Sequence, residues 1–508
     1  MSKEVLPRDL LFREHERTLG DLTYVVKGLT YDDILVVPAH SSVLPADVNL
    51  ESRIARGITL QVPIISAAMD KVTEYRLALA MAELGGLGIV HKNLSPEDQA
   101  RHCARVKANQ KGVIDTPVYV NQDETIDAIL GKKEENKWSF DTFPVVDDKG
   151  VLVGILTNRN LNRRKSATSL AKEVMTSSLV TAGKYTGFEE AYGILDERKV
   201  GTLPLVDEEG KLAGMYLRKD LKDFDIVRNP ISSRDEQGRL RVGAAVGVYD
   251  QAYKRAELLA PLGVDLLVVD SAHGNSEAVL ETIRQLRSTY PDWALVGGNI
   301  VTPDAVDRMA AAGADAVKVG IGPGSICTTR VVTGAGFPQA TAVNQCARRA
   351  AKYGLAVWAD GGIKYSGDVT KAFAVGADAV MIGSILAGTV EAPGEIIEIN
   401  GKDHKAYRGM GSEGAMRLQG SLDRYNQQKG KAIPEGIEGV VPLEGPVSLV
   451  LDRLVGGWRN GMGYAGAPDI PTLHKTVFLV EVTAAGQKEG HPTIKPTKEA
   501  PNYKVDVK

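Results

Sequence analysis

The segment Val317–Gln339, which reads VKVGIGPGSICTTRVVTGAGFPQ, starts as a short apolar strand and runs directly into a glycine-rich turn. Glycine at Gly320, Gly322 and Gly324 lets backbone N–H and C=O groups approach a bound anion or metal ion closely. The turn then presents Cys327, and a thiol in this setting is a candidate nucleophile because loop amides can favour the thiolate. From this segment alone, a buried structural cysteine remains the alternative.

The same pattern, an apolar run bounded by glycine or polar residues and followed by a helical pattern, occurs eight times. The eight segments are Val62–Asp70, Gly86–Asn93, Val242–Gly247, Asp265–Asn275, Ala294–Ile300, Ala316–Gly322, Ala356–Ile363 and Ala379–Ser384. Strands that alternate with helices predict parallel pairing, and eight such units predict an α/β fold of the (β/α)₈ TIM-barrel type. The repeat of GADAVKVG (313–320) as GADAVMIG (376–383) supports the barrel over the alternative, an open doubly wound sheet.

Polar residues gather where these predicted strands end, which is the face that carries chemistry in barrel enzymes. They are Ser66, Asp70, His91–Asn93, Asp270, His273, Asn299, the Cys327 loop, Asp360 and Ser384. Exposed strand ends are polar in any protein, which explains one or two of these residues but not the whole set. Gly361–Gly362 and Gly383–Ser384 fit a phosphate site built from backbone amides.

Between about residues 112 and 230 the barrel pattern stops. FPVVDDKGVLVGILTNRNL (143–161) recurs as LPLVDEEGKLAGMYLRKDL (203–221), in register at a spacing of sixty residues. This internal duplication predicts an inserted unit at 112–230, with the barrel formed by 1–111 and 231–508. The two copies resemble a tandem cystathionine-β-synthase (CBS, or Bateman) module, which commonly binds purine nucleotides such as ATP or GTP. A spacer or oligomerisation module that binds nothing is the alternative.

Composition narrows the class of protein. The 508 residues carry a net charge of −3 and no long basic run, so we expect no dedicated nucleic-acid site. No uninterrupted apolar stretch is long enough for a transmembrane helix, and the charged N-terminus is unlike a signal peptide. Three cysteines without close pairing predict a reducing, cytoplasmic setting with no disulfide framework or zinc site.

After the eighth predicted strand, about residues 400–445 replace the short loop expected there. Glycines and aromatic residues in AYRGMGSEGAM (406–416) and SLDRYNQQ (421–428) favour a mobile functional lid over simple disorder. A helix at Val447–Arg459 then closes the barrel. We expect an irregular lead-in over residues 1–50, apart from a strand-like run at Asp32–Pro38, and a strand-like VFLVEV segment in the tail.

With these motifs in view, nearly the whole chain resembles the inosine 5′-monophosphate (IMP) dehydrogenase family. The resemblance is carried by GIGPGSICTTR (320–330), ADGGIKYSGD (359–368), YRGMGSEGAM (407–416), DRY (423–425), PEGIEG (434–439) and GMGYAGA (461–467). It implies an NAD-dependent oxidoreductase that converts IMP to xanthosine 5′-monophosphate (XMP), the committed step of guanine nucleotide synthesis. It also implies homotetramers that can pair into octamers through the CBS modules.

The resemblance implies roles for individual residues. Cys327 would attack the purine carbon between the two ring nitrogens, with Thr329 beside the thiol and hydride passing to NAD⁺. The flap would carry Arg424 and Tyr425 into the vacated cofactor site to activate water, and the alternative for Arg424 is to orient water. The substrate residues would be Ser66, Met69, Ser325, Asp360, Gly362, Gly383, Ser384, Tyr407, Gly409, Met410, Gly411 and Glu435. The cofactor residues would be Asp270, Ser271, Asn299, Gly320 and Gly322.

The family also uses a monovalent cation, usually K⁺. Its implied ligands are backbone oxygens of Gly322, Gly324 and Cys327 together with Glu489, Gly490 and His491 of an adjacent subunit. The chain departs from the family pattern at Gly490, Asn426 and Ser271, which bears on cation binding, flap packing and cofactor affinity rather than on the reaction.

Two other functions compete with the dehydrogenase. GMP reductase shares the barrel, the thiol and a CTTR-type loop, but it removes ammonia with NADPH and needs no water-activating flap. A catalytically silent nucleotide sensor is the second, and an intact set of Cys327, Thr329, Asp360 and Arg424 argues against it.

Overall fold

The computed structural model describes the chain from Glu16 to Tyr503, apart from residues 20–22, 109–112, 115–116, 136–137, 139, 141, 163–167, 219–230, 426–432, 495–499 and 501. The chain divides into two compact units. One consists of Met1–Lys107 and Asn229–Lys508, and the other of Ala108–Arg228. The sequence had predicted an insertion at 112–230.

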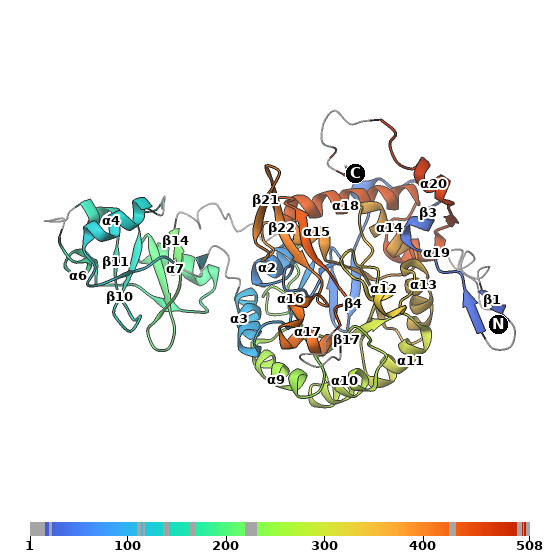
Figure 1. The fold of residues 1–508 in the computed structure, drawn as a ribbon, viewed down its shortest axis with the longest axis horizontal. Helices are drawn as coiled ribbons and strands as arrows, with labels where there is room; N and C mark the ends of the chain where they lie inside the picture. The colour runs from blue at the N-terminus through green and yellow to red at the C-terminus, as the bar shows by residue number, and fades with distance from the viewer. Residues whose placement is uncertain are drawn as a thin grey trace. The chain divides into compact units, whose positions relative to one another are not determined.

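The larger unit is a closed barrel of eight parallel strands in the order β15-β16-β17-β18-β19-β20-β6-β7 (Figure 1). The strands are β6 (Ile64–Ser66), β7 (Leu87–Val90), β15 (Gly243–Val246), β16 (Leu266–Asp270), β17 (Ala294–Ile300), β18 (Ala316–Val319), β19 (Ala356–Asp360) and β20 (Ala379–Ile382). Each lies within one of the eight predicted segments, and the predicted TIM-barrel fold is confirmed.

Helices surround the barrel and bury its outer surface (Figure 1). They are α2 (Tyr75–Glu83), α3 (Pro96–Lys107), α9 (Asp250–Leu259), α10 (Glu277–Thr289), α11 (Pro303–Ala312), α13 (Gln339–Ala350), α14 (Ser366–Ala374) and α18 (Val447–Tyr464). Neighbouring residues on a strand face opposite sides, so Ile64 joins the core under the helices while Ile65 joins the core inside the barrel.

A hairpin that the sequence analysis did not predict closes the N-terminal end of the barrel. Its strands are β4 (Ser52–Ala55) and β5 (Ile58–Leu60). Ile54 packs in the inner core, and its carbonyl oxygen accepts a 2.8 Å hydrogen bond from the buried Trp358 indole. Because this end is plugged, ligands enter from the opposite end, where the strands terminate.

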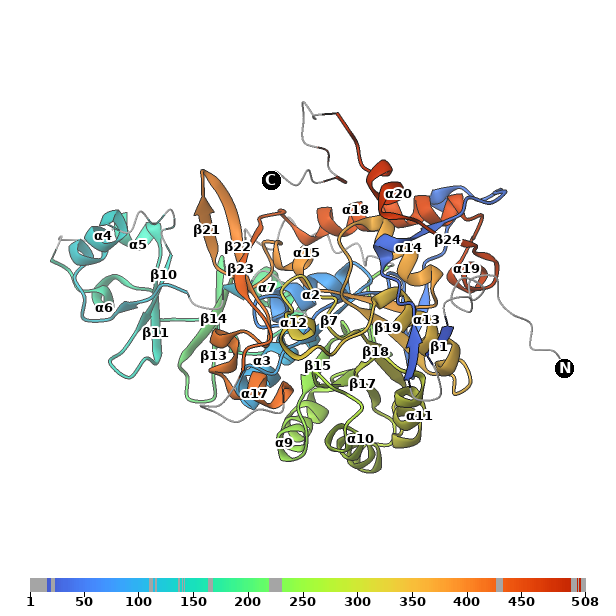
Figure 2. The same cartoon turned by 45° about the vertical axis from the view of Figure 1, so that its right-hand side comes forward.

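The region predicted as a mobile lid contains more regular structure than expected. Strands β21 (Ile396–Ile399), β22 (Lys402–Arg408) and β23 (Glu438–Pro442) form an antiparallel sheet (Figure 2). Two short helices, α16 (Glu413–Met416) and α17 (Gln419–Arg424), follow β22. The β22–β23 ladder pairs backbone N–H and C=O groups at both ends of the region. Residues 426–432 of the predicted lid lie outside the described part of the chain.

The termini of the barrel unit also differ from the predicted irregular lead-in. Strands β1 (Glu16–Leu19) and β2 (Thr23–Val26) form a hairpin. β3 (Ile34–Val36) pairs with β24 (Leu479–Glu481) of the predicted VFLVEV strand. The tail then continues through α20 (Ala484–Glu489). No helix in the described residues is long and apolar enough to cross a membrane.

The smaller unit shows the duplication in its geometry. β10 (Phe143–Val146) and β11 (Leu152–Leu156) form one hairpin, and β13 (Thr202–Val206) and β14 (Leu212–Leu217) form the other. Gly150 and Gly210 occupy equivalent turns with φ of 79° and 77°, a left-handed conformation that favours glycine. Helix α5 (Asn158–Asn162) follows the first hairpin, and the equivalent segment from 219 onward falls outside the described residues.

Candidate active site

The loop after β18 places Cys327 at the mouth of the barrel. Arg330, in the short helix α12 (Thr329–Thr333), braces the loop by donating from Nε to the Ile321 carbonyl at 3.2 Å and from Nη2 to the Phe337 carbonyl. A Cβ atom at Gly322 would lie 2.5 Å from the Arg330 side chain. The sequence therefore requires glycine here because arginine crosses the turn at close range.

Cys327 differs from the other two cysteines in exposure. Cys103 and Cys346 are buried, and burial raises the pKa of both thiols. Cys327 is half-buried, and its Sγ lies 3.2 Å from Thr329 Oγ1. Because a reactive thiol must be reachable and able to ionise, Cys327 is the candidate nucleophile among the three.

The PEGIEG motif pairs with the cysteine loop, a contact that sequence reasoning missed. Thr328 donates its backbone N–H to the Glu435 carbonyl at 2.9 Å, and Ile437 donates to the Ile326 carbonyl at 3.0 Å. Segments separated by more than a hundred residues thus fix the backbone around Cys327. Only the long-range pairing reveals this, because neither segment carries a local signal for the other.

A cavity of about 320 Å³ opens in front of Cys327, at the ends of the barrel strands. Most of the predicted site residues line it: Met69, Asp270, Asn299, Gly320, Gly322, Gly324, Ser325, Cys327, Thr329, Asp360, Gly362, Gly383, Ser384, Tyr407, Met410, Arg424 and Tyr425. The structure therefore brings together residues from six barrel strands and from the region after β20.

The remaining predicted residues do not line the cavity. Ser66 is fully buried and accepts a 2.8 Å hydrogen bond from Thr73. Ser271, Gly409 and Gly411 are chain neighbours of lining residues, and the Glu435 carbonyl accepts a hydrogen bond from Thr328 N–H, next to Cys327. Glu489, Gly490 and His491 are exposed at the end of α20, and the family resemblance assigns their role to a neighbouring subunit.

One end of the cavity is suited to an anion. Gly361 and Gly362 have φ of 90° and 84°, so the backbone turns without a side chain in the way. A Cβ atom at Gly383 would lie 2.8 Å from Tyr407 Oη and 3.3 Å from Met69 Sδ. Bare backbone beside a phenol, whose pKa burial raises and which is therefore a neutral donor, is a suitable phosphate cradle.

A buried lysine organises the polar wall of the cavity. Lys318 Nζ lies 2.6 Å from Asp360 Oδ2 and 3.1 Å from Asp270 Oδ1, and it also donates to Asn299 Oδ1. The sequence analysis did not single it out, although a lysine inside the apolar strand AVKV is a signal that could have found it. A carboxylate has several acceptor sites, so Asp360 can still accept hydrogen bonds from a ribose diol.

Arg424 and Tyr425 of the DRY motif line the same cavity. Arg424 forms an ion pair with the buried Asp270, and its carbonyl accepts a 2.9 Å hydrogen bond from Ala272 N–H. A Cβ atom at Gly411 would lie 2.6 Å from the Tyr425 ring, so this ring packs on bare backbone. Burial lowers the pKa of the Arg424 guanidinium and raises that of Tyr425. Arg424 therefore contacts the carboxylate that was predicted to face the cofactor.

The described residues contain no group of three or more His, Cys, Asp or Glu side chains placed to hold a metal ion. A cation at the Gly322–Cys327 turn would therefore depend on main-chain oxygens, which suit a large alkali ion. The Gly324 carbonyl already accepts from Cys327 N–H at 3.1 Å, and a carbonyl oxygen has a second lone pair. The main-chain part of the predicted K⁺ site, in the Gly322–Cys327 turn, is therefore compatible with the fold.

Comparison with known proteins agrees with this arrangement. The model of the IMP dehydrogenase / GMP reductase domain matches residues 28–493. The chain belongs to this family. It is 48% identical over 483 residues to an inosine-5′-monophosphate dehydrogenase of Halalkalibacterium halodurans, covering 94% of this chain and 98% of the relative. It is 47% identical over 487 residues to that of Bacillus subtilis, with the same coverage.

A solved structure within the IMP dehydrogenase / GMP reductase family is also similar. GMP reductase from Trypanosoma brucei in complex with guanosine 5′-monophosphate matches with a TM-score of 0.69 and 36% identity, covering 93% of this chain and 99% of the other. The family assignment therefore contains the dehydrogenase and the reductase, two of the three functions that the sequence analysis left in competition.

Proposed function

We propose that this protein oxidises IMP to XMP with NAD⁺ as the hydride acceptor. The observation that carries the proposal is the position of Arg424 and Tyr425 in the same cavity as Cys327, with Arg424 held by Asp270. These residues provide polar groups for water chemistry that a dehydrogenase needs and a reductase does not. The 47–48% identity to IMP dehydrogenases over nearly the whole chain supports the same choice.

The reaction divides into two steps at Cys327. The thiolate adds to C2 of the purine, hydride leaves C2, and a thioimidate remains bonded to Sγ. Bound NAD⁺ supplies the acceptor for that hydride. Water then adds to the same carbon and the thiol departs, which gives XMP and regenerates the enzyme. Covalent capture of this kind replaces one difficult step by two easier ones.

The remaining lining residues fit the other parts of IMP. Gly362, Gly383, Ser384, Ser325 and Tyr407 bind the phosphate, and Asp360 accepts the ribose hydroxyls. Asp270, Ser271 and Asn299 bind the cofactor until hydride transfer is complete. The flap then brings Arg424 to Asp270, where Arg424 orients the attacking water and stabilises the developing charge.

Other functional features extend the proposal to the assembly. The inserted unit is a tandem CBS module that binds purine nucleotides such as ATP or GTP. Glu489, Gly490 and His491 complete a K⁺ site in a neighbouring subunit of a homotetramer, and tetramers can pair into octamers. The reaction takes place in the cytoplasm, which suits an enzyme that depends on a free thiol.

GMP reductase is the alternative, because a GMP reductase is among the solved structures that resemble this chain. The test follows NADH absorbance with IMP and NAD⁺ in K⁺ buffer, alongside GMP with NADPH. Steady NADH formation is the expected result, whereas NADPH consumption with GMP would establish the reductase instead.

Two variants complete this test. Cys327→Ala removes the proposed nucleophile and should abolish turnover without unfolding the protein. Cys346→Ala removes a buried thiol outside the cavity and should retain turnover. Loss of activity in both variants, or in neither, would contradict the role of Cys327.

A further inference from the structure

Two buried basic side chains lie beneath the flap, and neither has been given a role above. Lys92, just after β7, is 1% exposed, and Arg255 of α9 is 4% exposed. Lys92 Nζ donates to the Asp270 carbonyl at 2.8 Å. Arg255 donates to the carbonyls of Lys92 and Leu94 at 2.9 and 2.7 Å. These hydrogen bonds satisfy donors but bring no negative charge to either side chain.

Helix α17 of the flap lies directly on this pair. A Cβ atom at Gly420 would lie 2.3 Å from the Lys92 carbonyl oxygen, so the helix touches the backbone at the end of β7. Ser421 Oγ accepts a 2.8 Å hydrogen bond from Asn93 Nδ2. Asp423 follows these two contact residues on the same short helix.

Asp423 is the acidic residue of this helix. A Cβ atom at Gly247, just after β15, would lie 3.5 Å from Lys92 Nζ and 3.9 Å from Asp423 Oδ2. The ammonium and the carboxylate therefore face the same small space, which glycine leaves open. Asp423 also acts electrostatically on both Lys92 and Arg255, favouring the charged form of each.

Two adjacent flap residues thus lie near groups of opposite charge. Asp423 shares the space beside Gly247 with Lys92 and acts electrostatically on Arg255, and Arg424 pairs with the carboxylate of Asp270. Moving the flap by one residue would place like charge against like charge. Charge pairs in a water-poor environment interact strongly, so this alternation selects one register of the closed flap.

We propose that Lys92 and Arg255 form a cationic receptor for the Asp423 carboxylate, and that this contact positions Arg424 for the hydrolysis step. Asp423, Lys92 and Arg255 are positioning residues, because they act through Arg424 rather than on the reacting atoms. The inference rests on the proposed function and specifies how its flap is held closed.

The charge of the receptor depends on its neighbours. The groups that face Lys92 are Arg424 and Asp423 of α17, Arg255 of α9, Lys318 of β18 and Asp270 of β16. Burial, reinforced by Arg424, lowers the pKa of Lys92 to about 7, so Lys92 is fully charged only below that pH and Arg255 supplies the charge of the receptor above it. Burial also lowers the pKa of Arg255, which starts from a much higher value and remains charged at neutral pH.

The test compares pre-steady-state and steady-state NADH formation in Asp423→Asn. The NADH burst, which reports hydride transfer, should keep its rate and amplitude. Steady-state turnover should fall roughly 10- to 100-fold, the size expected for losing one charge-assisted contact. Asp423→Glu should restore part of the turnover. The matched control is Glu413→Gln, which removes an exposed charge paired with Arg417 in the same region and should change neither phase.

A double-variant cycle identifies the partner. If Asp423 acts through Lys92, then Asp423→Asn should cost much less in a Lys92→Met background than in the wild type. Full additivity of the two losses would overturn the pairing. A parallel fall of burst and steady state in Asp423→Asn would also overturn it, because it would indicate a general structural defect.

Hydrogen–deuterium exchange provides a readout that does not depend on the reaction. Peptides covering residues 417–425 should exchange faster in Asp423→Asn than in the wild type or in Glu413→Gln. Unchanged exchange would overturn the receptor. If the wild type itself formed no NADH with IMP, the proposed function would fail, while the exchange result would still decide whether Asp423 holds the flap.

Discussion

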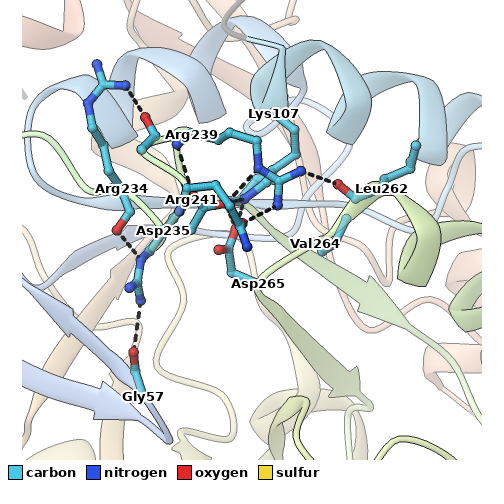
Figure 3. Close-up of polar contacts among 12 residues, drawn as sticks. Gly57, Lys107, Arg234, Asp235, Arg239, Arg241, Leu262, Val264 and Asp265 are labelled. Atoms are coloured by element: carbon cyan, nitrogen blue, oxygen red, sulfur yellow. Dashed lines mark hydrogen bonds and ion pairs between the residues drawn. The ribbon is translucent and has the colours of Figure 1, made fainter.

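Each end of the barrel contains a buried lysine, and the two lysines differ in how their charge is compensated. At the N-terminal end, Lys107 Nζ lies 2.8 Å from Asp235 Oδ2 and 2.9 Å from Asp265 Oδ2, so its charge is matched by two carboxylates (Figure 3). At the catalytic end, Lys92 Nζ donates to a neutral carbonyl, and Arg255 and Arg424 lie nearby. The charge of the lysine at the N-terminal end is compensated by carboxylates of the barrel unit itself. At the catalytic end, compensation depends on the flap.

The compensated end also fixes the chain where the inserted unit leaves and returns. Lys107 is the last residue of α3, and Asp235 follows the return to the barrel. Arg239 Nε donates to Asp235 Oδ2 at 2.9 Å, while Arg241 donates to the carbonyls of Arg234 and Gly57 (Figure 3). Although burial opposes it, hydrogen bonds from Lys107 and Arg239 hold the pKa of Asp235 below its ordinary value.

This contrast separates stability from function. A permanent ion-pair network, as at Lys107, suits a junction that must not move. A basic side chain with little compensating charge, as at Lys92, suits the proposed surface where the flap replaces the cofactor. The comparison predicts that substitutions at the N-terminal end change stability, and that substitutions at the catalytic end change turnover or its pH dependence.

The largest expected effect is that of Lys107→Ala. It leaves Asp235 and Asp265 without their shared cation, and breaking a buried pair in this way costs about 3–5 kcal/mol of unfolding free energy. Urea unfolding measures the loss, and turnover per folded molecule should be unchanged. A turnover defect without destabilisation would break the comparison between the two ends.

Gly420→Ala should give the next largest effect. The added Cβ would lie 2.3 Å from the Lys92 carbonyl oxygen, so α17 could not keep its present position against the end of β7. We expect a roughly 10-fold or larger loss of steady-state turnover, about 1.4 kcal/mol, with the NADH burst retained. Gly439, where a Cβ would meet no atom within 4 Å, provides the matched control as Gly439→Ala.

Lys92→Met should alter the pH dependence of stability. Between about pH 7 and 10.5 the unfolded chain binds a proton at Lys92 and the folded chain does not, so wild-type stability rises with pH there. The slope is at most about 1.4 kcal/mol per pH unit. The variant lacks this contribution and should gain most over the wild type near pH 7 and below. Lys254→Met, at an exposed position on α9, should show no such trend.

The smallest effect is expected for Arg284→Ala on α10. Arg284 pairs with Glu277 and Glu281 on the surface, where water screens the charges. The urea midpoint should not move measurably. A loss comparable to that of Lys107→Ala would show that burial is not what distinguishes the junction.

Local signals were sufficient to predict the barrel. Helix α11 shows local signals at both ends, because Pro303 occupies its first turn and Gly313 takes the left-handed conformation after its last residue. The plug hairpin β4–β5 was missed because its strands are short and interrupted by Arg56–Gly57. Its role depends on contact with Trp358, which no local pattern contains.

The sequence motifs also predicted most of the residues of the site, but not the contacts that hold them. Motifs pointed to the residues that line the cavity, since each motif lies at a strand end or in the flap. They did not reveal Lys318, the brace formed by Arg330, or the pairing of Glu435 with Thr328. Each of these depends on the direction of a side chain or on a partner far along the chain, which the barrel geometry determines.

The position of the inserted unit has a consequence for biosynthesis. β6 and β7 precede it in the chain, and the other six barrel strands follow it. A ribosome therefore completes the insertion while only a quarter of the barrel exists, and β6 waits for β20 before the ring can close. Because domains generally fold as units during synthesis, we expect the insertion to fold first and the nascent barrel to keep an exposed strand edge until β20 has been synthesised.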